Sequence, residues 1–140
     1  MVCQKRIFNQ EKAVNYVALF GRILFASIFI LKPLEHFSKA MMDHASSMGV
    51  PLSEWLVPLA GLLAFLGGVS ILLGYKAKIG AWFLVAFLIP TTFFMHRFWD
   101  TEGLSSTMMQ QYCFMKNISL LGASLMIAYF GSGPLSLSKK

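Results

Sequence analysis

The sequence predicts an all-α integral membrane protein, a four-transmembrane-helix bundle that forms a single membrane domain over residues 1–140. Two observations predict this fold class: the composition of the chain and the distribution of its charged residues. The 140 residues are 56% hydrophobic and 13% charged, and the mean hydropathy is +0.63. Soluble domains carry about 25% charged residues and are less apolar. These values exclude an ordinary water-soluble domain.

Long segments without charge define the helices. Residues 55–75, 79–95 and 117–138 contain no Asp, Glu, Lys or Arg, and each approaches or exceeds the roughly 17–25 residues that a helix needs to cross a bilayer. An earlier apolar segment carries Arg22 at its centre. It starts too far from the N-terminus, and is too polar at its middle, for a cleaved signal peptide. We predict spans at about residues 13–31, 54–74, 79–95 and 114–131.

The charges predict an orientation. Four spans put both termini on one side, with the turn at residues 74–78. That side carries the cations Lys5, Arg6, Lys12, Lys76, Lys78, Lys139 and Lys140, with Glu11 as its acid. The other side carries Lys32, Lys39, Arg97 and Lys116 against the acids Glu35, Asp43, Glu54, Asp100 and Glu102. Because cytoplasmic loops are enriched in Lys and Arg, we predict cytoplasmic termini. The net charge of +6 is then a topology signal, and no nucleic-acid motif accompanies it.

Small residues mark one helix face. Ala60, Ala64 and Gly68 recur at steps of four, a spacing that lets another helix approach closely in lipid. Pro90 interrupts the third span, and we weigh a cavity at a kink against a tolerated membrane proline. The loop at residues 32–54 is expected to begin as a short amphipathic helix, and the tail at residues 131–140 to be an exposed end.

Arg22 is the first candidate functional residue. A cation at the centre of a span costs about 2.5–3.5 kcal/mol on insertion scales, so such residues usually face the interior and have a partner. No acid lies within any span. The remaining partners are a ligand oxygen, a free backbone carbonyl, or a hydroxyl from Ser70, Ser124 or Tyr129. A structural role and a functional role both remain open.

His96 and Asn117 are the second candidate pair, where the apolar run FFM gives way to HRFW. His96 can exchange a proton near physiological pH, and Asn117 begins the last span on the same side. Arg97 and Trp99 are typical of a membrane interface. Arg22 and His96 are expected about 15 Å apart, half a bilayer, so they can be two separate features.

A third hypothesis is copper handling on the non-cytoplasmic side, since thioether and imidazole ligands suit Cu(I). The residues concerned are His36, His44, His96, Met41, Met42, Met48, Met95, Met108, Met109 and Met115. Methionine also fills gaps in apolar regions, and no tight repeated Met motif occurs. We therefore assign no metal ligand. Motifs for serine hydrolases, P-loops, zinc proteases and dinucleotides are absent too, as are flavin, haem and iron-sulfur motifs.

Six segments carry a family resemblance. The sequence reads GRILF at 21–25, MGVP at 48–51, GGVSILLGY at 67–75, His96 closing the third span, FMKNISLLG at 114–122 and GSGPLSL at 131–137. Their order resembles the DoxX family of small four-helix membrane proteins, over about residues 14–137. The resemblance implies recurring polar positions at Arg22, His96, Lys116 and Asn117. It also implies a link to quinone-coupled sulfur oxidation or membrane redox complexes, known for some members.

One position departs from the family. Where many members read like LLEFGGG, this chain reads LLAFLGG, with Ala64 in place of the acid. If that acid pairs with the first-span arginine, Arg22 has lost its counter-ion and needs a ligand, another subunit or a rearranged network.

These patterns lead to one principal hypothesis. We expect a multi-pass protein of a bacterial-type inner (plasma) membrane, a small accessory or quinone-interacting subunit of a membrane redox complex. Arg22, His96 and Asn117 are the expected quinone-binding residues, and the partners are the lipid bilayer, redox subunits and another copy of the chain. The alternatives are a noncatalytic scaffold or assembly factor, which docks through Arg22 and the small-residue face, and copper handling. Catalysis itself stays undecided.

Overall fold

A computed structural model describes the backbone of residues 2–138 and the side chains of Gln10 and residues 12–138. Every regular element in this part of the chain is helical. They are α1 (Val2–Leu31), η1 (Lys32–Phe37), α2 (Lys39–Ser47), α3 (Ser53–Leu73), α4 (Ala77–Met95), η2 (Phe98–Asp100) and α5 (Leu104–Phe130). Four segments are long and apolar enough to cross a membrane: Lys12–Phe37, Ser53–Leu73, Ala77–Asp100 and Leu104–Phe130. The prediction of an all-α chain with four candidate spans is confirmed.

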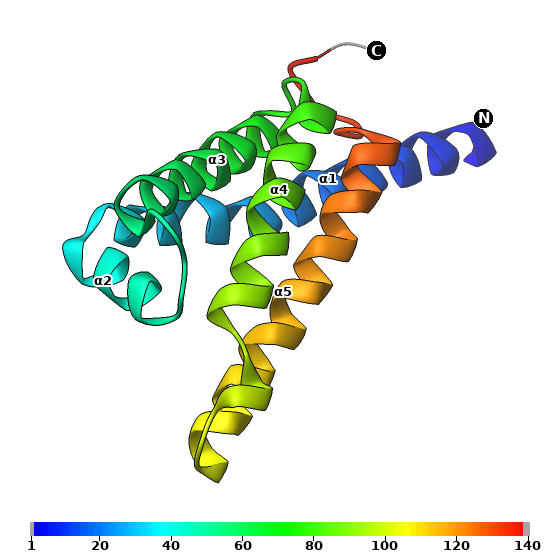
Figure 1. Cartoon of the computed structure of the whole chain (residues 1–140). Helices are drawn as coiled ribbons and strands as arrows, with labels where there is room; N and C mark the ends of the chain where they lie inside the picture. Colours follow the sequence, from blue (N-terminus) through cyan, green and yellow to red (C-terminus); the bar gives the residue numbers. More distant parts are fainter. Residues whose placement is uncertain (1, 139–140) are drawn as a thin grey trace.

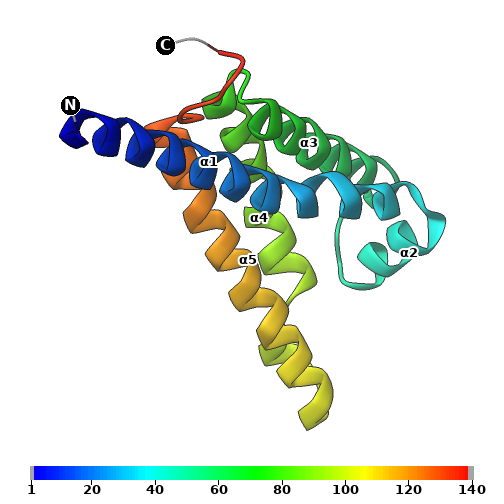
Figure 2. The same cartoon turned by 180° about the vertical axis from the view of Figure 1, so that it is seen from behind.

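The four long helices form two pairs that share one corner. Helix α1 packs on α3, α3 on α4, and α4 on α5. Figure 1 shows the α1 and α3 pair diverging from the α4 and α5 pair, with the tight turn between α3 and α4 at the point where they meet. Seen from behind in Figure 2, α1 crosses the end of α5 and its first turns extend beyond the other helices. The opposite ends of the two pairs are spread apart, with η1 and α2 on that side of the molecule.

Glycines on α3 bring three neighbouring segments close. A Cβ atom at Gly61 would lie 2.7 Å from His36 Cβ, one at Gly67 would lie 2.7 Å from the Gly80 carbonyl oxygen, and one at Gly68 would lie 2.9 Å from Phe29 Cβ. Ala64, between them, is fully buried. The predicted close contact along this face of α3 is therefore confirmed, and its partners are η1, α4 and α1.

The outer surfaces of the long helices carry large apolar side chains. Trp82 is 57% exposed and Tyr129 is 77% exposed, and Phe20, Leu24, Leu62, Phe93, Leu125 and Met126 are exposed as well. Such a surface is unfavourable in water and favourable against acyl chains. The exposed surface thus agrees with a membrane-embedded bundle.

Helix α4 continues through Pro90. Proline has no N–H to donate to the Ala86 carbonyl four residues earlier. In the next two positions, Thr91 Oγ1 donates to the Phe87 carbonyl (2.8 Å) and Thr92 Oγ1 to the Leu88 carbonyl (2.6 Å). Ala86 and Pro90 both line an apolar cavity, so the cavity considered for this proline is present.

The C-terminal segment contains no buried residue over its described part, residues 131–138, as predicted, but hydrogen bonds hold it in place; residues 139–140 of the predicted exposed end lie outside the described residues. The Leu137 amide donates to the Leu73 carbonyl (3.1 Å) and the Ser138 amide donates to the Gly74 carbonyl (3.2 Å). Gly74 has φ +66° and lies so close that a Cβ there would meet Ser136. The segment therefore folds back over the turn between α3 and α4, because backbone groups on both sides satisfy one another.

Candidate functional site

A cavity of about 260 Å³ lies between the two helix pairs, on the side where they diverge. Its inner wall is apolar and is built by Ile28, Phe29, Ala64, Phe87, Leu88 and Leu120. Polar side chains from η1, α4 and α5 line the rest: Lys32, Glu35, His36, Thr91, His96, Lys116 and Asn117. Ligand sites commonly combine an apolar wall with a few converging polar groups, so we take this cavity as the candidate site.

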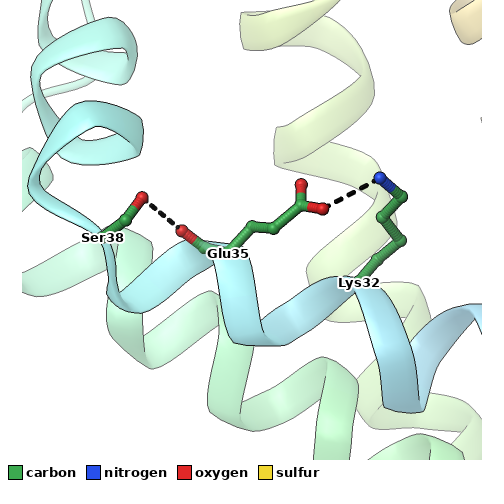
Figure 3. A network of polar contacts seen from close by, with 3 residues as sticks. All are labelled: Lys32, Glu35 and Ser38. Carbon is green, nitrogen blue, oxygen red and sulfur yellow. Dashed lines mark hydrogen bonds and ion pairs between the residues drawn. The ribbon is translucent and has the colours of Figure 1, made fainter.

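The 3₁₀ segment η1 carries three of the polar groups because it extends α1 by a tighter turn that begins at Lys32 and includes Pro33. Lys32 Nζ forms an ion pair with Glu35 Oε1 at 3.0 Å, and Ser38 Oγ donates to the Glu35 carbonyl at 2.7 Å. Figure 3 shows the Lys32 and Glu35 side chains meeting on one side of η1. Ser38 also caps α2 by accepting from the Met41 amide. The pair is more than half exposed, so it contributes little stability and mainly sets the charge at the rim.

His36 is the most enclosed of the three polar groups on η1. Its ring packs edge-on against Phe87, with 5.6 Å between ring centroids, and its Cβ lies against Gly61. The Nδ1 atom is buried and makes no hydrogen bond of normal geometry among the described residues, although the Lys32 carbonyl lies close to the ring. A buried polar atom without a partner costs about 1–3 kcal/mol, which a ligand can recover.

His96 ends α4 and reaches the cavity from the opposite side. Its Nδ1 atom lies 2.9 Å from Gln110 Oε1 on α5. Because an amide oxygen only accepts, Nδ1 carries the hydrogen, and Nε2 is left as an acceptor. His96 is therefore oriented by α5, and one ring nitrogen remains free to accept a hydrogen bond.

Asn117 and Lys116 bring α5 to the cavity. The Asn117 side chain is 5% exposed, whereas Lys116 is exposed at the rim. Among the described residues neither makes a hydrogen bond or ion pair through its side chain. Since Lys32 is paired with Glu35, Lys116 gives the cavity a positive charge. The polar side chains around the cavity can together bind a flat apolar ring through its oxygen atoms, because hydrogen-bonding groups lie on opposite sides of the cavity.

Arg22 does not line this cavity. Its Nη1 donates to the Ser132 carbonyl at 2.9 Å and more weakly to the Pro134 carbonyl at 3.4 Å, and its Nη2 donates to the Leu135 carbonyl at 2.6 Å. The side chain is buried, and its Nε atom has no described partner. Of the partners that the sequence left open, the backbone carbonyl is the one found.

The position of Arg22 corrects two expectations. We expected it near the middle of the membrane, but it lies against Gly74 and the C-terminal segment, level with the ends of α3 and α5. An acid at the position of Ala64 would also not pair with it. Ala64 lines the cavity and precedes Gly74 on α3 by about 15 Å of helix rise. The missing acid therefore bears on the cavity and leaves Arg22 unaffected.

The copper hypothesis stays a prediction, since four of its candidate ligands line the cavity and the structure does not test a site built mainly from methionines. His36, His96, Met41 and Met95 line the cavity, while His44 lies exposed on α2. No group of three or more His, Cys, Asp or Glu side chains placed to hold a metal occurs in the described part of the chain.

Lys32, Glu35, Thr91 and Gln110 were not predicted from the sequence as site residues, and His36 was considered only as a copper ligand. Lys32, Glu35 and His36 follow the steps of three and four that put side chains on one helical face. This pattern could have been recognised if the first helix had been extended past Pro33. Gln110 gave no signal, because its role depends on where α5 meets the end of α4.

Four apolar helices around a cavity of mixed polarity define a multi-pass membrane protein with a ligand-sized interhelical site. The chain belongs to the DoxX family, whose model, described as DoxX, matches residues 17–97.

The curated relatives of this chain agree with that assignment. The chain is similar to inner membrane protein YqjF of Escherichia coli K12, with 32% identity over 131 residues, 92% of this chain and 95% of the relative. It is also similar to inner membrane protein YphA of the same strain, with 26% identity over 140 residues, 96% of this chain and 97% of the relative. A surfeit locus protein 4 homolog of Drosophila melanogaster is 28% identical over 132 residues, 94% of this chain but 43% of that protein. No solved structure matches. The protein is a multi-pass inner-membrane protein.

Proposed function

We propose that the chain is a small quinone-binding accessory subunit of a membrane redox complex, with the quinone ring in the cavity between η1, α4 and α5. The single observation that carries this proposal is the buried Nδ1 atom of His36, which makes no hydrogen bond of normal geometry among the described residues and belongs to a residue that lines a cavity with an apolar inner wall. Such an atom favours a ligand that brings its own oxygen atom. A ring carbonyl or hydroxyl does this, and the apolar wall suits the ring.

His96 and Asn117 have the complementary chemistry for the same ligand. The free Nε2 of His96 accepts from a hydroxyl, and the Asn117 amide donates to a carbonyl. Lys116 adds a positive charge at the rim, which favours any negative charge on a ring oxygen. A bound quinone carries electrons and protons between redox sites. The residues named here hold the ring and exchange hydrogen bonds with it. Since the chain has no motif for another redox cofactor, the electrons belong to a partner subunit.

The proposed ligand site excludes Arg22, which we assign to holding the C-terminal segment. The scaffold alternative relied on Arg22 and on the small-residue face of α3 as docking features. Both have intramolecular partners: Arg22 binds the Ser132 and Leu135 carbonyls, and Gly61, Gly67 and Gly68 are covered by neighbouring segments. A scaffold would therefore have to dock through another surface.

We further propose that both termini face the cytoplasm, which puts the cavity in the non-cytoplasmic half of the bilayer. The basic residues of the termini and of the turn at 74–78 support this orientation. Single cysteines at Ser138 and Glu102, in a chain without its native cysteines, test it. An impermeant maleimide added to intact cells is expected to label only position 102, and labelling of position 138 alone would reverse the topology.

Binding of a quinone tests the proposed function. We expect the purified chain in lipid nanodiscs to bind a decyl-substituted benzoquinone, and Asn117→Leu to weaken that binding about tenfold. This is the effect of about 1.4 kcal/mol that one lost hydrogen bond has. Ser119→Ala is the matched control, because Ser119 lies on the same helix, is exposed and bonds only to its own helix. Absence of binding to the unmodified chain, or equal affinities of the two variants, would contradict the proposal.

A further inference from the structure

A second cavity adjoins the first. It has a volume of about 310 Å³ and lies between α2, α3 and α4. Its lining is apolar apart from His36 and Thr91, with Val50, Leu59, Ala60 and Ala86 among its walls. No charged residue lines it. By its chemistry it accepts hydrocarbon and gives a polar headgroup nothing to bind.

The two cavities share part of their lining. His36, Met41, Phe87, Thr91 and Met95 line both, so these side chains form the common wall. Two of them are methionines, whose unbranched side chains rearrange readily. The polar cavity and the apolar cavity therefore adjoin along these side chains, and the methionines among them can move aside for a chain that passes from one cavity to the other.

The apolar cavity also borders the lipid-facing surface. Leu59 is 51% exposed and Phe94 is 43% exposed, and both belong to its lining. A chain that passes through it can continue into the surrounding acyl chains. The polar cavity, the apolar cavity and the lipid-facing surface thus lie one after another. A ligand with a polar ring and a long hydrocarbon tail has its parts in the same order.

We infer that the apolar cavity holds the first part of the hydrocarbon tail of the ligand whose ring lies in the polar cavity. This inference rests on the proposed function and narrows it: the ligand class is a quinone with a long alkyl or isoprenoid tail, and tailless quinones or small phenols bind less well. Transfer of a tail from lipid gains no hydrophobic energy, so the preference comes from packing against the cavity wall.

Two probes and three variants test the inference. The probes are a substituted benzoquinone without a tail and the same ring with a decyl tail, measured in nanodiscs against the concentration of probe in the membrane. Ala86→Phe fills the apolar cavity from α4. Ala86 is already exposed, so the larger ring should not strain the fold. Leu59→Trp narrows the cavity from α3, and Ala13→Phe makes the same chemical change as Ala86→Phe on an exposed part of α1 away from both cavities.

We expect the unmodified chain to bind the decyl probe at least tenfold more tightly than the tailless ring. Ala86→Phe and Leu59→Trp should each reduce the decyl affinity to that of the tailless ring, leave the tailless affinity unchanged, and leave the melting temperature near that of Ala13→Phe. Equal binding of both probes by the unmodified chain would overturn the inference and leave the proposed function intact. Loss of both probes in the folded variants would place the ring in the apolar cavity and would also overturn it. Failure of both probes to bind the unmodified chain would remove the proposed function together with the inference.

Discussion

Replacing Arg22 with alanine is expected to lower the free energy of unfolding by about 3 kcal/mol, because three carbonyls lose a charged donor at once. These carbonyls belong to Ser132, Pro134 and Leu135. Arg22→Lys should lose less, since an ammonium group keeps the charge but cannot fork between separate acceptors. Unfolding by a graded denaturing detergent measures both variants. Lys39→Ala, at an exposed position on α2, is the control and should be nearly neutral.

Arg22→Ala also distinguishes the structural role of this residue, holding the C-terminal segment, from a role in ligand binding. A cysteine at Ser136, which is half-buried under the folded-back segment, should react slowly with maleimide in the unmodified chain and several times faster in Arg22→Ala. Quinone affinity should stay unchanged in that variant. Loss of quinone binding with continued protection of position 136 would contradict the assignment, and would return Arg22 to the ligand site that the sequence suggested.

Gly67→Ala is expected to destabilise the bundle by about 2–3 kcal/mol. The added Cβ would lie 2.7 Å from the Gly80 carbonyl oxygen and 2.7 Å from Leu84 Cδ2. The backbone of α4 cannot move aside without separating α3 from α4. Both helices belong to the hydrophobic core, where Leu84 is fully buried.

Gly122→Ala is the matched control for this change. Gly122 lies on α5, and a Cβ there would meet nothing within 4 Å. Alanine at that position should stabilise the helix by up to about 1 kcal/mol, because glycine loses more backbone entropy. Equal stabilities of the Gly67 and Gly122 variants would mean that α3 and α4 do not pack as closely as described.

The four long helices were predictable from the length of the apolar segments, since a helix that crosses a bilayer needs a long run of residues without charge. The buried face of α3 was predictable for a similar reason, because few residues allow helices to approach as closely as Gly61 and Gly68 do. Both inferences depend on local sequence alone, and the structure agrees with them.

The tail, the depth of Arg22 and the cavity depend on how distant segments meet. GSGPLS reads as a flexible end, and its carbonyls find their donor only in Arg22, on the distant helix α1. The predicted first span ended at Leu31, so Arg22 was placed at its centre, whereas the apolar segment continues through η1 to Phe37. His36 was assigned to a loop, and its place across the cavity from His96 follows from the divergence of the two helix pairs.

Photolabelling with a ring-diazirine benzoquinone tests the central claim most directly. The probe is added to the full chain in nanodiscs, with an excess of unlabelled decyl-tailed quinone as competitor, and the modified residues are identified by mass spectrometry. The account predicts competed labels on η1, at residues 91–95 of α4 and the following His96, and at residues 116–120 of α5. Labels confined to lipid-facing positions such as Trp82 and Leu125, or gathered around Arg22, would contradict a ring bound between the two helix pairs.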